Sequence, residues 1–166
     1  MMIFATVGTQ LPFDRLIREL DEWAGANPKA KVFAQVGMSD YEPGHLSWAR
    51  TLTQKQFSES MSTCDVVVAH AGMGTIISGV EQGKRVVVMP RQAEFGEHRN
   101  DHQLATVKRL GHIKGLQVAH PDTGLSVLLD QIRDAGCSQD AAGEPALSAS
   151  PGLISEIRLF AGLAAH

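Results

Sequence analysis

The sequence predicts an α/β domain in which a parallel β-sheet carries helices on both faces. Valine-rich runs at 65–69 and 85–89 are typical of strands that are buried on both faces of a sheet. Segments with a helical spacing of apolar residues alternate with such runs, which indicates parallel strands joined by right-handed crossovers. Glycine-containing loops follow the apolar runs at 2–7 and 65–69. Loops in this position form the ligand-binding edge of an open α/β sheet.

The composition is that of one ordinary globular domain. The chain has 166 residues, of which 43% are hydrophobic and 20% are charged, and this argues against disorder and against a fibrous repeat. The formal net charge of -3 gives no electrostatic reason to expect nucleic acid as a partner. No apolar run approaches the roughly 20 residues that span a bilayer, and the N-terminus leads into a strand instead of a signal peptide. We therefore expect a cytoplasmic protein.

Three strands and one helix are expected in the first third of the chain. The strands are expected at 2–7, at 31–36 and, as a short extended segment, at 46–52. Between the first two strands, apolar residues recur at helical spacing, namely Phe13, Leu16, Ile17, Leu20 and Trp23. This spacing predicts an amphipathic helix that lies on the sheet.

A second helix is predicted by the pattern at its start. Thr53 followed by Gln56 has the spacing of a capping box, in which each side chain accepts a hydrogen bond from a backbone N–H. The helix is expected at 54–63 and should bury Phe57 and Met61.

The segment 65–91 is predicted to form a strand, a helix and a second strand. Thr75 is expected to cap the helix, and Gly83 is expected to end it. The residues expected to face the sheet are Ile76, Ile77, Gly79 and Val80.

The turn before this helix is a candidate anion site. Gly72 and Gly74 leave out side chains where a ligand can approach the backbone, and N–H groups at the start of a helix favour an anion. His70 lies at the carboxyl end of the strand, where open α/β sheets bind ligands. These residues predict a diphosphate site near 72–75. The alternative interpretation is that these glycines, and Gly8 in the first loop, only shape tight turns.

The most polar part of the chain follows this unit. Asn100 or Asp101 is expected to cap a helix that ends at Gly111, which places His102 and Gln103 in its first turn. That turn should face the same edge of the sheet.

The predicted domain ends with one more strand and helix. The strand is expected within 113–119, and Asp122 or Thr123 is expected to cap a helix that ends near Gly136. The domain therefore covers 1–137.

The rest of the chain has a different character. Residues 138–152 are rich in Ala, Ser, Gly and Pro, which predicts a linker, and 153–166 predict a short amphipathic helix. This helix is expected either to pack on its own domain or to dock on a partner. Cys64 and Cys137 stand apart from any metal-like spacing and are expected to be reduced thiols.

Three motifs, taken in order, resemble one family. They are HAGMGTI at 70–76, GKRVVVMPR at 83–91 and GEHRNDHQLATV at 96–107. They resemble the C-terminal, donor-binding domain of glycosyltransferase family 28, and most closely its stand-alone form in two-subunit transferases. Examples of that form are the small cytosolic subunit of the eukaryotic UDP-GlcNAc transferase of N-glycan assembly and the PssE-like subunits of bacterial exopolysaccharide synthesis. The similarity covers about 2–133.

The resemblance implies a Rossmann-like fold, equivalent to the C-terminal half of a GT-B glycosyltransferase, that holds a UDP-sugar as donor and needs no cofactor. Residues 8–10 and 72–75 would face the diphosphate, and Gln35 and Gly37 match a QxG signature near the nucleotide. The polar residues of the NDHQ-like motif would contact the sugar. Together with the residues considered above, this predicts the donor-binding residues Gly8, Thr9, Gln10, Gln35, Gly37, His70, Gly72, Met73, Gly74, Thr75, Ser78, Arg91, Glu97, His98, Asn100, His102 and Gln103.

One position departs from the family pattern. Where relatives carry an acidic residue that holds the ribose hydroxyls, this chain has Ser78, whose neutral hydroxyl makes a weaker hydrogen bond. Glu81, one helical turn further on, is the alternative.

N–H groups at the start of the helix, with Arg91 or His70, would stabilise the charge of the leaving nucleoside diphosphate without a metal.

A metal site must be weighed against this interpretation. His98 and His102 are four residues apart, with Glu97 and Asp101 nearby, which fits two metal ligands. No third ligand is evident, so no metal is expected. His98 and Arg99 are instead expected to form a polar loop over the sugar, or a solvated loop that binds nothing.

The resemblance also implies a partner. In two-domain relatives, the general base that deprotonates the acceptor hydroxyl belongs to the other half. A membrane-anchored acceptor-binding subunit is therefore expected to present a polyprenyl-diphosphate-linked acceptor and to recruit the chain to the cytoplasmic face of the membrane. The chain is expected to bind the donor and to transfer little by itself, and a homo-oligomer is compatible with the sequence.

Two other functions share parts of the pattern. A dinucleotide-binding oxidoreductase has the same strand, glycine turn and helix, although the GxGxxG spacing and the acidic residue about 20 positions on are missing. A non-catalytic regulatory subunit would keep the fold and lose donor binding, and Ser78 is the sequence feature that favours it.

Overall fold

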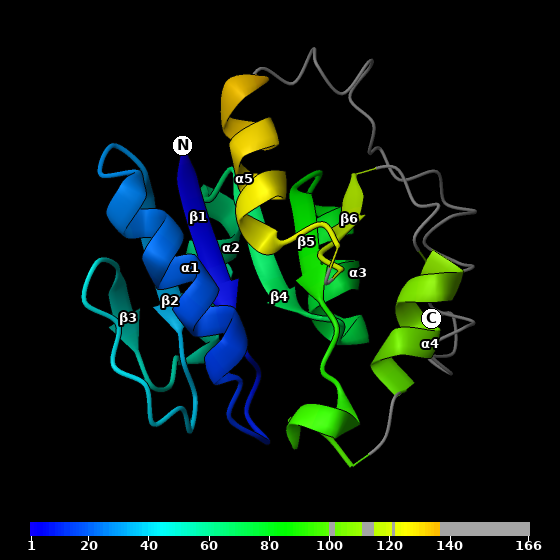
Figure 1. Ribbon diagram of the computed structural model, residues 1–166. Helices are drawn as coiled ribbons and strands as arrows, with labels where there is room; N and C mark the ends of the chain where they lie inside the picture. The colour runs from blue at the N-terminus through cyan, green and yellow to red at the C-terminus, as the bar shows by residue number, and fades with distance from the viewer. Residues whose placement is uncertain (100–101, 111–114, 121, 137–166) are drawn as a thin grey trace.

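The computed structural model describes residues 1–99, 102–110, 115–120 and 122–136. Within these ranges the chain forms a six-stranded sheet in the order β3-β2-β1-β4-β5-β6, and every strand pair is parallel (Figure 1). The strands are β1 (Met2–Thr6), β2 (Lys31–Gln35), β3 (Ser47–Ala49), β4 (Val66–His70), β5 (Arg85–Met89) and β6 (Leu116–Val118). The predicted parallel sheet is confirmed, and each expected strand is present.

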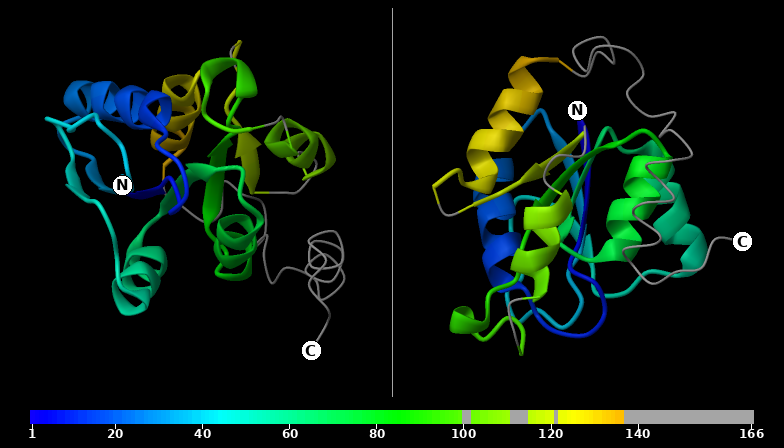
Figure 2. Two further views of the ribbon diagram at one scale, coloured as in Figure 1. Left: turned by 90° about the horizontal axis from the view of Figure 1, so that it is seen from below. Right: turned by 90° about the vertical axis from the view of Figure 1, so that its right-hand side faces the viewer.

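Helices cover both faces of the sheet, as predicted. They are α1 (Asp14–Ala26), α2 (Gln54–Thr63), α3 (Met73–Glu81), α4 (His102–Leu110), α5 (Leu125–Asp134) and the 3-10 helix η1 (Ala93–Phe95). On one face α1 and α5 lie side by side (Figure 2), and the indole N–H of Trp23 donates a 2.9 Å hydrogen bond to Asp130. On the other face α2, α3 and α4 pack against the sheet.

The alternation of side chains along β4 explains these two layers. Val66 and Val68 pack in the core under α1 and α5, whereas Val67 and Ala69 pack in the core under α2 and α3. All four residues are fully buried, because successive side chains of a strand point to opposite faces. Burial of each such valine contributes about 1.5–3 kcal/mol. The central strand is therefore held from both sides, as its apolar sequence predicts.

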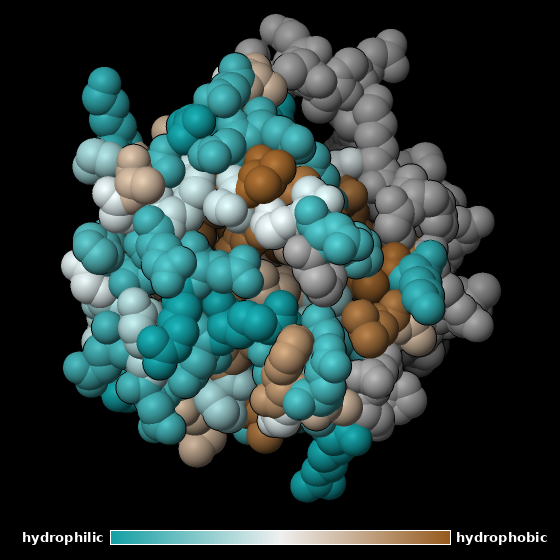
Figure 3. Space-filling view, viewed as in Figure 1, coloured by the Kyte–Doolittle hydropathy of each residue, from teal (hydrophilic) through white to brown (hydrophobic). Residues whose placement is uncertain are grey.

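Helix α1 is amphipathic. The residues predicted to face the sheet are all buried, namely Phe13, Leu16, Ile17, Leu20 and Trp23. Mainly hydrophilic side chains cover the outer surface of the α1 side of the molecule (Figure 3). The helical spacing of apolar residues therefore identified the contact face of α1 correctly.

The start of α2 also follows its sequence pattern. Thr53 and Gln56 form the reciprocal capping box, and α2 has the expected bounds. Met61 is fully buried, and Phe57 packs partly buried against the same core. Cys64, directly after the helix, is a buried free thiol, and burial raises the pKa of this thiol.

Two predicted helix caps are wrong. The N-cap of α3 is Gly72, and Thr75 lies inside the first turn, because the chain enters the helix immediately after β4. The N-cap of α5 is Gly124 instead of Asp122 or Thr123. The backbone of Thr123 is already engaged in an isolated β-bridge, which sets the start of α5 one residue later.

Some expectations fall outside the described residues. These are the cap at Asn100 or Asp101, the helix end at Gly111, the linker at 138–152 and the helix at 153–166. Among the residues that are described, no helix is both long enough and apolar enough to cross a membrane.

The strand order places a topological switch between β1 and β4. From β1 the chain continues outward to β2 and β3 on one side, and from β4 it continues to β5 and β6 on the other. The connections after β1 and β4 therefore leave the sheet in opposite directions, which opens a crevice at the carboxyl ends of these two strands.

Candidate functional site

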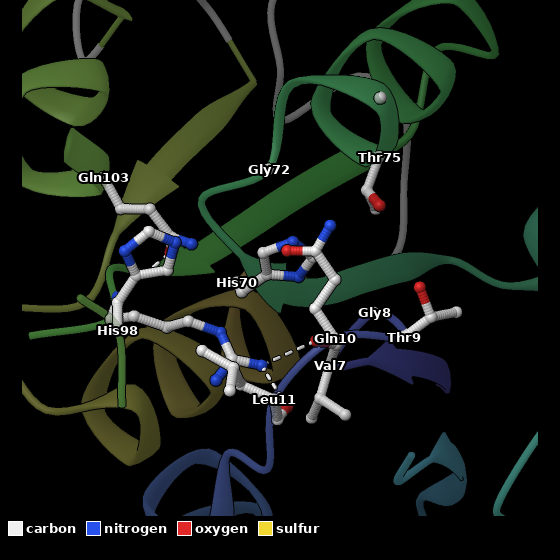
Figure 4. A pocket seen from close by; sticks show the side chains of 12 residues that line it. Val7, Gly8, Thr9, Gln10, Leu11, His70, Gly72, Thr75, His98 and Gln103 are labelled. Carbon is white, nitrogen blue, oxygen red and sulfur yellow. Dashed lines mark hydrogen bonds between the residues drawn. The ribbon is translucent and has the colours of Figure 1, made fainter. Parts of the chain in front are cut away.

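A cavity of about 330 Å³ lies at this crevice. Three segments form it, namely the loop after β1, the turn between β4 and α3, and the stretch from the end of β5 into α4 (Figure 4). The lining residues are Val7, Gly8, Thr9, Gln10, Leu11, His70, Gly72, Gly74, Thr75, Arg91, His98 and Gln103. The sequence places a ligand site at this edge, and most of the residues that it nominates meet here.

Other nominated residues lie elsewhere. Those that are described but do not line the cavity are Gln35, Gly37, Met73, Ser78 and Glu97. Asn100 is outside the described residues, and His102 is described only as the first residue of α4.

The imidazole of His70 fills the space between the two glycine loops. A Cβ atom added to Gly72 would lie 2.3 Å from Nε2 of His70, and one added to Gly8 would lie 2.9 Å from Cε1. Gly8 also has a φ of +77°, which residues with side chains rarely adopt. These two glycines therefore make room for the histidine ring. Gly74 differs, because nothing lies within 4 Å of an added Cβ there, and this leaves space for a ligand.

His70 is neutral at physiological pH. Its Nδ1 atom is buried and has no hydrogen-bond partner among the described residues. Burial lowers the pKa of His70 to about 4, and the positive charge of Arg91 acts in the same direction. A neutral imidazole carries one N–H donor and one acceptor. His70 can therefore contribute to this site as a neutral hydrogen-bonding group and not as a cation.

The start of α3 supplies backbone donors. Gly72 has an extended backbone at the N-cap, and the first hydrogen bond of the helix runs from the N–H of Ile76 to its carbonyl at 3.2 Å. The N–H groups of residues 73–75 precede this bond and have no acceptor within the helix. Thr75 adds a side-chain hydroxyl to the cavity wall. This helix start is suited to an anion, through its free N–H groups and its dipole.

Gln103 joins two of the segments that form the cavity. Its Oε1 atom accepts hydrogen bonds from the N–H of Ala71 at 3.1 Å and the N–H of Arg91 at 3.0 Å. Only the oxygen of the amide can accept from two N–H groups, so the orientation of the amide is fixed. The Nε2 atom of Gln103 therefore presents donors to the cavity.

Arg91 is buried and bonded to backbone. Its guanidinium donates hydrogen bonds to the carbonyl oxygens of Val7, Leu11, Pro12 and Glu97. Burial lowers the pKa of Arg91, and the charge of Glu97 opposes this effect. The sequence nominates Arg91 as a group that stabilises a leaving diphosphate, but in the structure its Nη donors are engaged by these carbonyl groups.

The QxG residues lie beneath the loop after β1. Gln35 accepts a 2.7 Å hydrogen bond from the hydroxyl of Thr6 and donates to the carbonyls of Gly8 at 3.1 Å and Arg50 at 2.9 Å. Gly37 has a φ of +58°, and a Cβ there would lie 3.0 Å from the carbonyl oxygen of Gly8. Both residues therefore support the cavity wall from behind.

Glu97 also has a supporting role. Its carboxylate accepts two 2.8 Å hydrogen bonds from Arg15 and one of 2.9 Å from the N–H of Gln92. Sequence reasoning missed Arg15, because an arginine near the start of an amphipathic helix has the pattern of a solvated residue.

Among the described residues, no three side chains of the metal-ligating types come together.

A comparison with protein families gives the identity of the domain. The model of the glycosyltransferase family 28 C-terminal domain matches residues 2–156. The chain belongs to this family. The match extends beyond residue 133, where the sequence resemblance was expected to end. A comparison with curated proteins found no match.

Solved glycosyltransferases share the fold of this family 28 domain. The kitacinnamycin glycotransferase has a TM-score of 0.66 at 20% identity, over 95% of this chain and 39% of that chain. MurG of Acinetobacter baumannii has a TM-score of 0.59 at 19% identity, over 96% of this chain and 49% of that chain. Os79 from O. sativa, solved in complex with UDP, has a TM-score of 0.59 at 14% identity, over 97% of this chain and 40% of that chain. The chain spans less than half the length of each of these structures.

These comparisons confirm the predicted fold class. The family 28 domain is a Rossmann-like α/β structure, equivalent to the C-terminal half of a GT-B glycosyltransferase. The family match also leaves the dinucleotide-binding oxidoreductase without support.

The burial of neutral His70 predicts a pH dependence of stability. In the unfolded chain this histidine has its ordinary pKa of 6.5, so the unfolded state binds more protons than the native state between pH 6.5 and about 4. The contribution of His70 to stability is therefore complete above pH 6.5 and is lost as the pH falls toward 4. We expect urea unfolding to show that, between pH 7 and pH 4.5, the free energy of unfolding falls by about 2 kcal/mol more for wild type than for His70→Gln. Equal losses would show that the native histidine protonates freely.

Proposed function

We propose that the chain is the donor-binding half of a glycosyltransferase that uses a UDP-sugar. The family match supports glycosyl transfer, and the crevice where β1 and β4 diverge supports a nucleotide site at the carboxyl edge of the sheet. The observation that carries the proposal is the meeting of two backbone segments, 8–11 and 72–75, around one cavity. Both are rich in N–H donors, which suit the two phosphates of a nucleoside diphosphate.

The chemistry of transfer fits this arrangement. When the glycosidic bond to the diphosphate breaks, negative charge grows on the leaving phosphate oxygens. Fixed N–H groups at the start of α3 and in the loop after β1 would stabilise that charge without having to reorganise. Neutral His70 would add a hydrogen bond, and the buried charge of Arg91, which also lines the cavity, would add a favourable field. In this proposal these groups stabilise charge and do not act as the general base.

The sugar is proposed to lie toward the third wall of the cavity. Gln103 and His98 line this wall, and the fixed Nε2 of Gln103 would donate to a sugar hydroxyl or a phosphate oxygen. Ser78 lies on α3 outside the cavity lining, so contact between its hydroxyl and the ribose would require the nucleoside to extend along α3.

The acceptor is proposed to come from a second subunit. A GT-B transferase has two halves, and the sequence of this chain resembles stand-alone donor-binding subunits. We propose a membrane-anchored partner that supplies the general base and a polyprenyl-diphosphate-linked acceptor at the cytoplasmic face of the membrane. Assembly of a polysaccharide or glycan is the process that such an acceptor serves.

A charge placed at Gly74 tests the diphosphate site. Nothing lies within 4 Å of an added Cβ at Gly74, and an aspartate in the first turn of a helix is favourable, so Gly74→Asp should fold. Its carboxylate would face the phosphates, whereas Gly74→Asn introduces a neutral side chain of the same shape. We expect calorimetry to show at least tenfold weaker UDP binding for the Asp variant than for the Asn variant, about 1.4 kcal/mol or more. Equal affinities would place the diphosphate elsewhere.

The division of labour between two subunits is tested by activity. The purified chain should bind UDP but transfer sugar to a polyprenyl-diphosphate acceptor only slowly. Addition of the acceptor-binding subunit should raise the rate about 100-fold or more, the range that a positioned general base provides. The measurement is transfer of radiolabelled sugar from a panel of UDP-sugars. Turnover by the chain alone at the rate of the complex would rule out a base on the partner.

A further inference from the structure

Four carbonyl groups of the loop after β1 accept hydrogen bonds from buried side chains. The guanidinium of Arg91 donates to three of them, at 2.8, 2.7 and 2.6 Å, namely those of Val7, Leu11 and Pro12. A fourth, the carbonyl of Gly8, accepts a 3.1 Å hydrogen bond from Nε2 of Gln35. Four of the six carbonyl groups in 7–12 therefore bond to two buried side chains, those of Arg91 and Gln35.

The same loop is rich in free donors. The N–H groups of Thr9, Gln10 and Leu11 find no acceptor among the described residues. All three residues line the cavity. Successive N–H groups in a short loop form a concave site for an anion. The loop thus has four carbonyl groups bonded to the protein and three N–H groups available to a ligand.

The charge of Arg91 is bonded to this loop, and Arg91 also lines the cavity. Arg91 is 3% exposed and packs on the ring of Phe13, with 4.6 Å between the guanidinium carbon and the ring centre. The carboxylate of Glu97 bonds to Arg15 at 2.8 Å, and the contact of Glu97 with Arg91 is through its backbone carbonyl, at 3.0 Å. A buried charge without a directly bonded counter-ion is costly. A phosphate in the cavity would offset that cost.

We propose that Arg91 and Gln35 are positioning residues that hold loop 7–12 as a receptor for the phosphate oxygens of the nucleotide. The inference rests on the proposed donor site and extends it, because neither side chain acts through direct contact with the ligand. Gln35 does not line the cavity. Arg91 lines it, but its Nη atoms are already bonded to carbonyl groups. These roles replace the expectation that both residues contact the donor.

Lysine cannot make the set of hydrogen bonds that Arg91 makes. A guanidinium is a planar fork of five N–H donors that reaches several carbonyl groups at once, whereas an ammonium group offers three donors from one point. Arg91→Lys therefore keeps the positive charge and loses the geometry. Gln35→Met keeps the approximate volume and loses the hydrogen bond to Gly8. Asp21→Asn is a matched control, because Asp21 is also buried but holds the loop after β2.

The experiment compares UDP with uridine in these proteins. Calorimetry measures the affinity of wild type and of the three variants for both ligands, and hydrogen exchange without ligand measures the opening of the peptide that contains 7–12. Arg91→Lys and Gln35→Met should each lose tenfold or more of the UDP affinity, keep the uridine affinity and exchange faster in this peptide. Asp21→Asn should lose stability and keep the wild-type ratio of UDP affinity to uridine affinity.

Each other outcome counts against the inference. Wild-type UDP affinity in Arg91→Lys and Gln35→Met would overturn it and leave the proposed donor site intact. Equal losses of UDP and uridine affinity in these two variants would also overturn it, because that result indicates a general loss of structure. A wild-type protein that bound UDP no better than uridine would overturn the proposed diphosphate site, and the inference with it.

Discussion

The site depends on one imidazole ring placed between two loops at the point where the strand order reverses. Because β1 and β4 are neighbours and their connections diverge, the loops that contain Gly8 and Gly72 face each other across the crevice. The ring of His70 fits between them only because neither glycine has a Cβ atom. Both glycine turns line the cavity, and N–H groups of 9–11 and 73–75 supply donors there.

The electrostatics of the cavity follow from this construction. His70 is neutral because it is buried beside Arg91, and Arg91 lines the cavity with Nη groups that are already bonded to carbonyl oxygens. Gln103 is likewise locked by two backbone N–H groups. Donors that are fixed before the ligand arrives stabilise growing charge without reorganisation, which is the requirement for a leaving diphosphate.

Local patterns in the sequence predicted much of the fold and the edge at which the site lies. The valine-rich run at 65–69 and the capping box at Thr53 are formed by residues that are close together in the sequence. Periodicity and spacing were therefore sufficient to predict this strand and the start of this helix. The function of individual site residues depended instead on contacts between distant parts of the chain. Arg91 binds carbonyl groups about 80 positions earlier, at separations of 79 to 84 residues, and no local pattern encodes such contacts. For the same reason the sequence explained Gly72 by the turn in which it lies. In the structure, Gly72 makes room for the ring of His70.

A crystal structure of the chain with UDP tests these conclusions most directly. The diphosphate is expected between the N–H groups of residues 9–11 and those of 73–75, at hydrogen-bond distances of about 2.7–3.2 Å from both segments. Arg91 is expected to remain bonded to the loop carbonyl groups. A nucleotide bound at another edge of the sheet, or a diphosphate paired directly with the guanidinium, would contradict them.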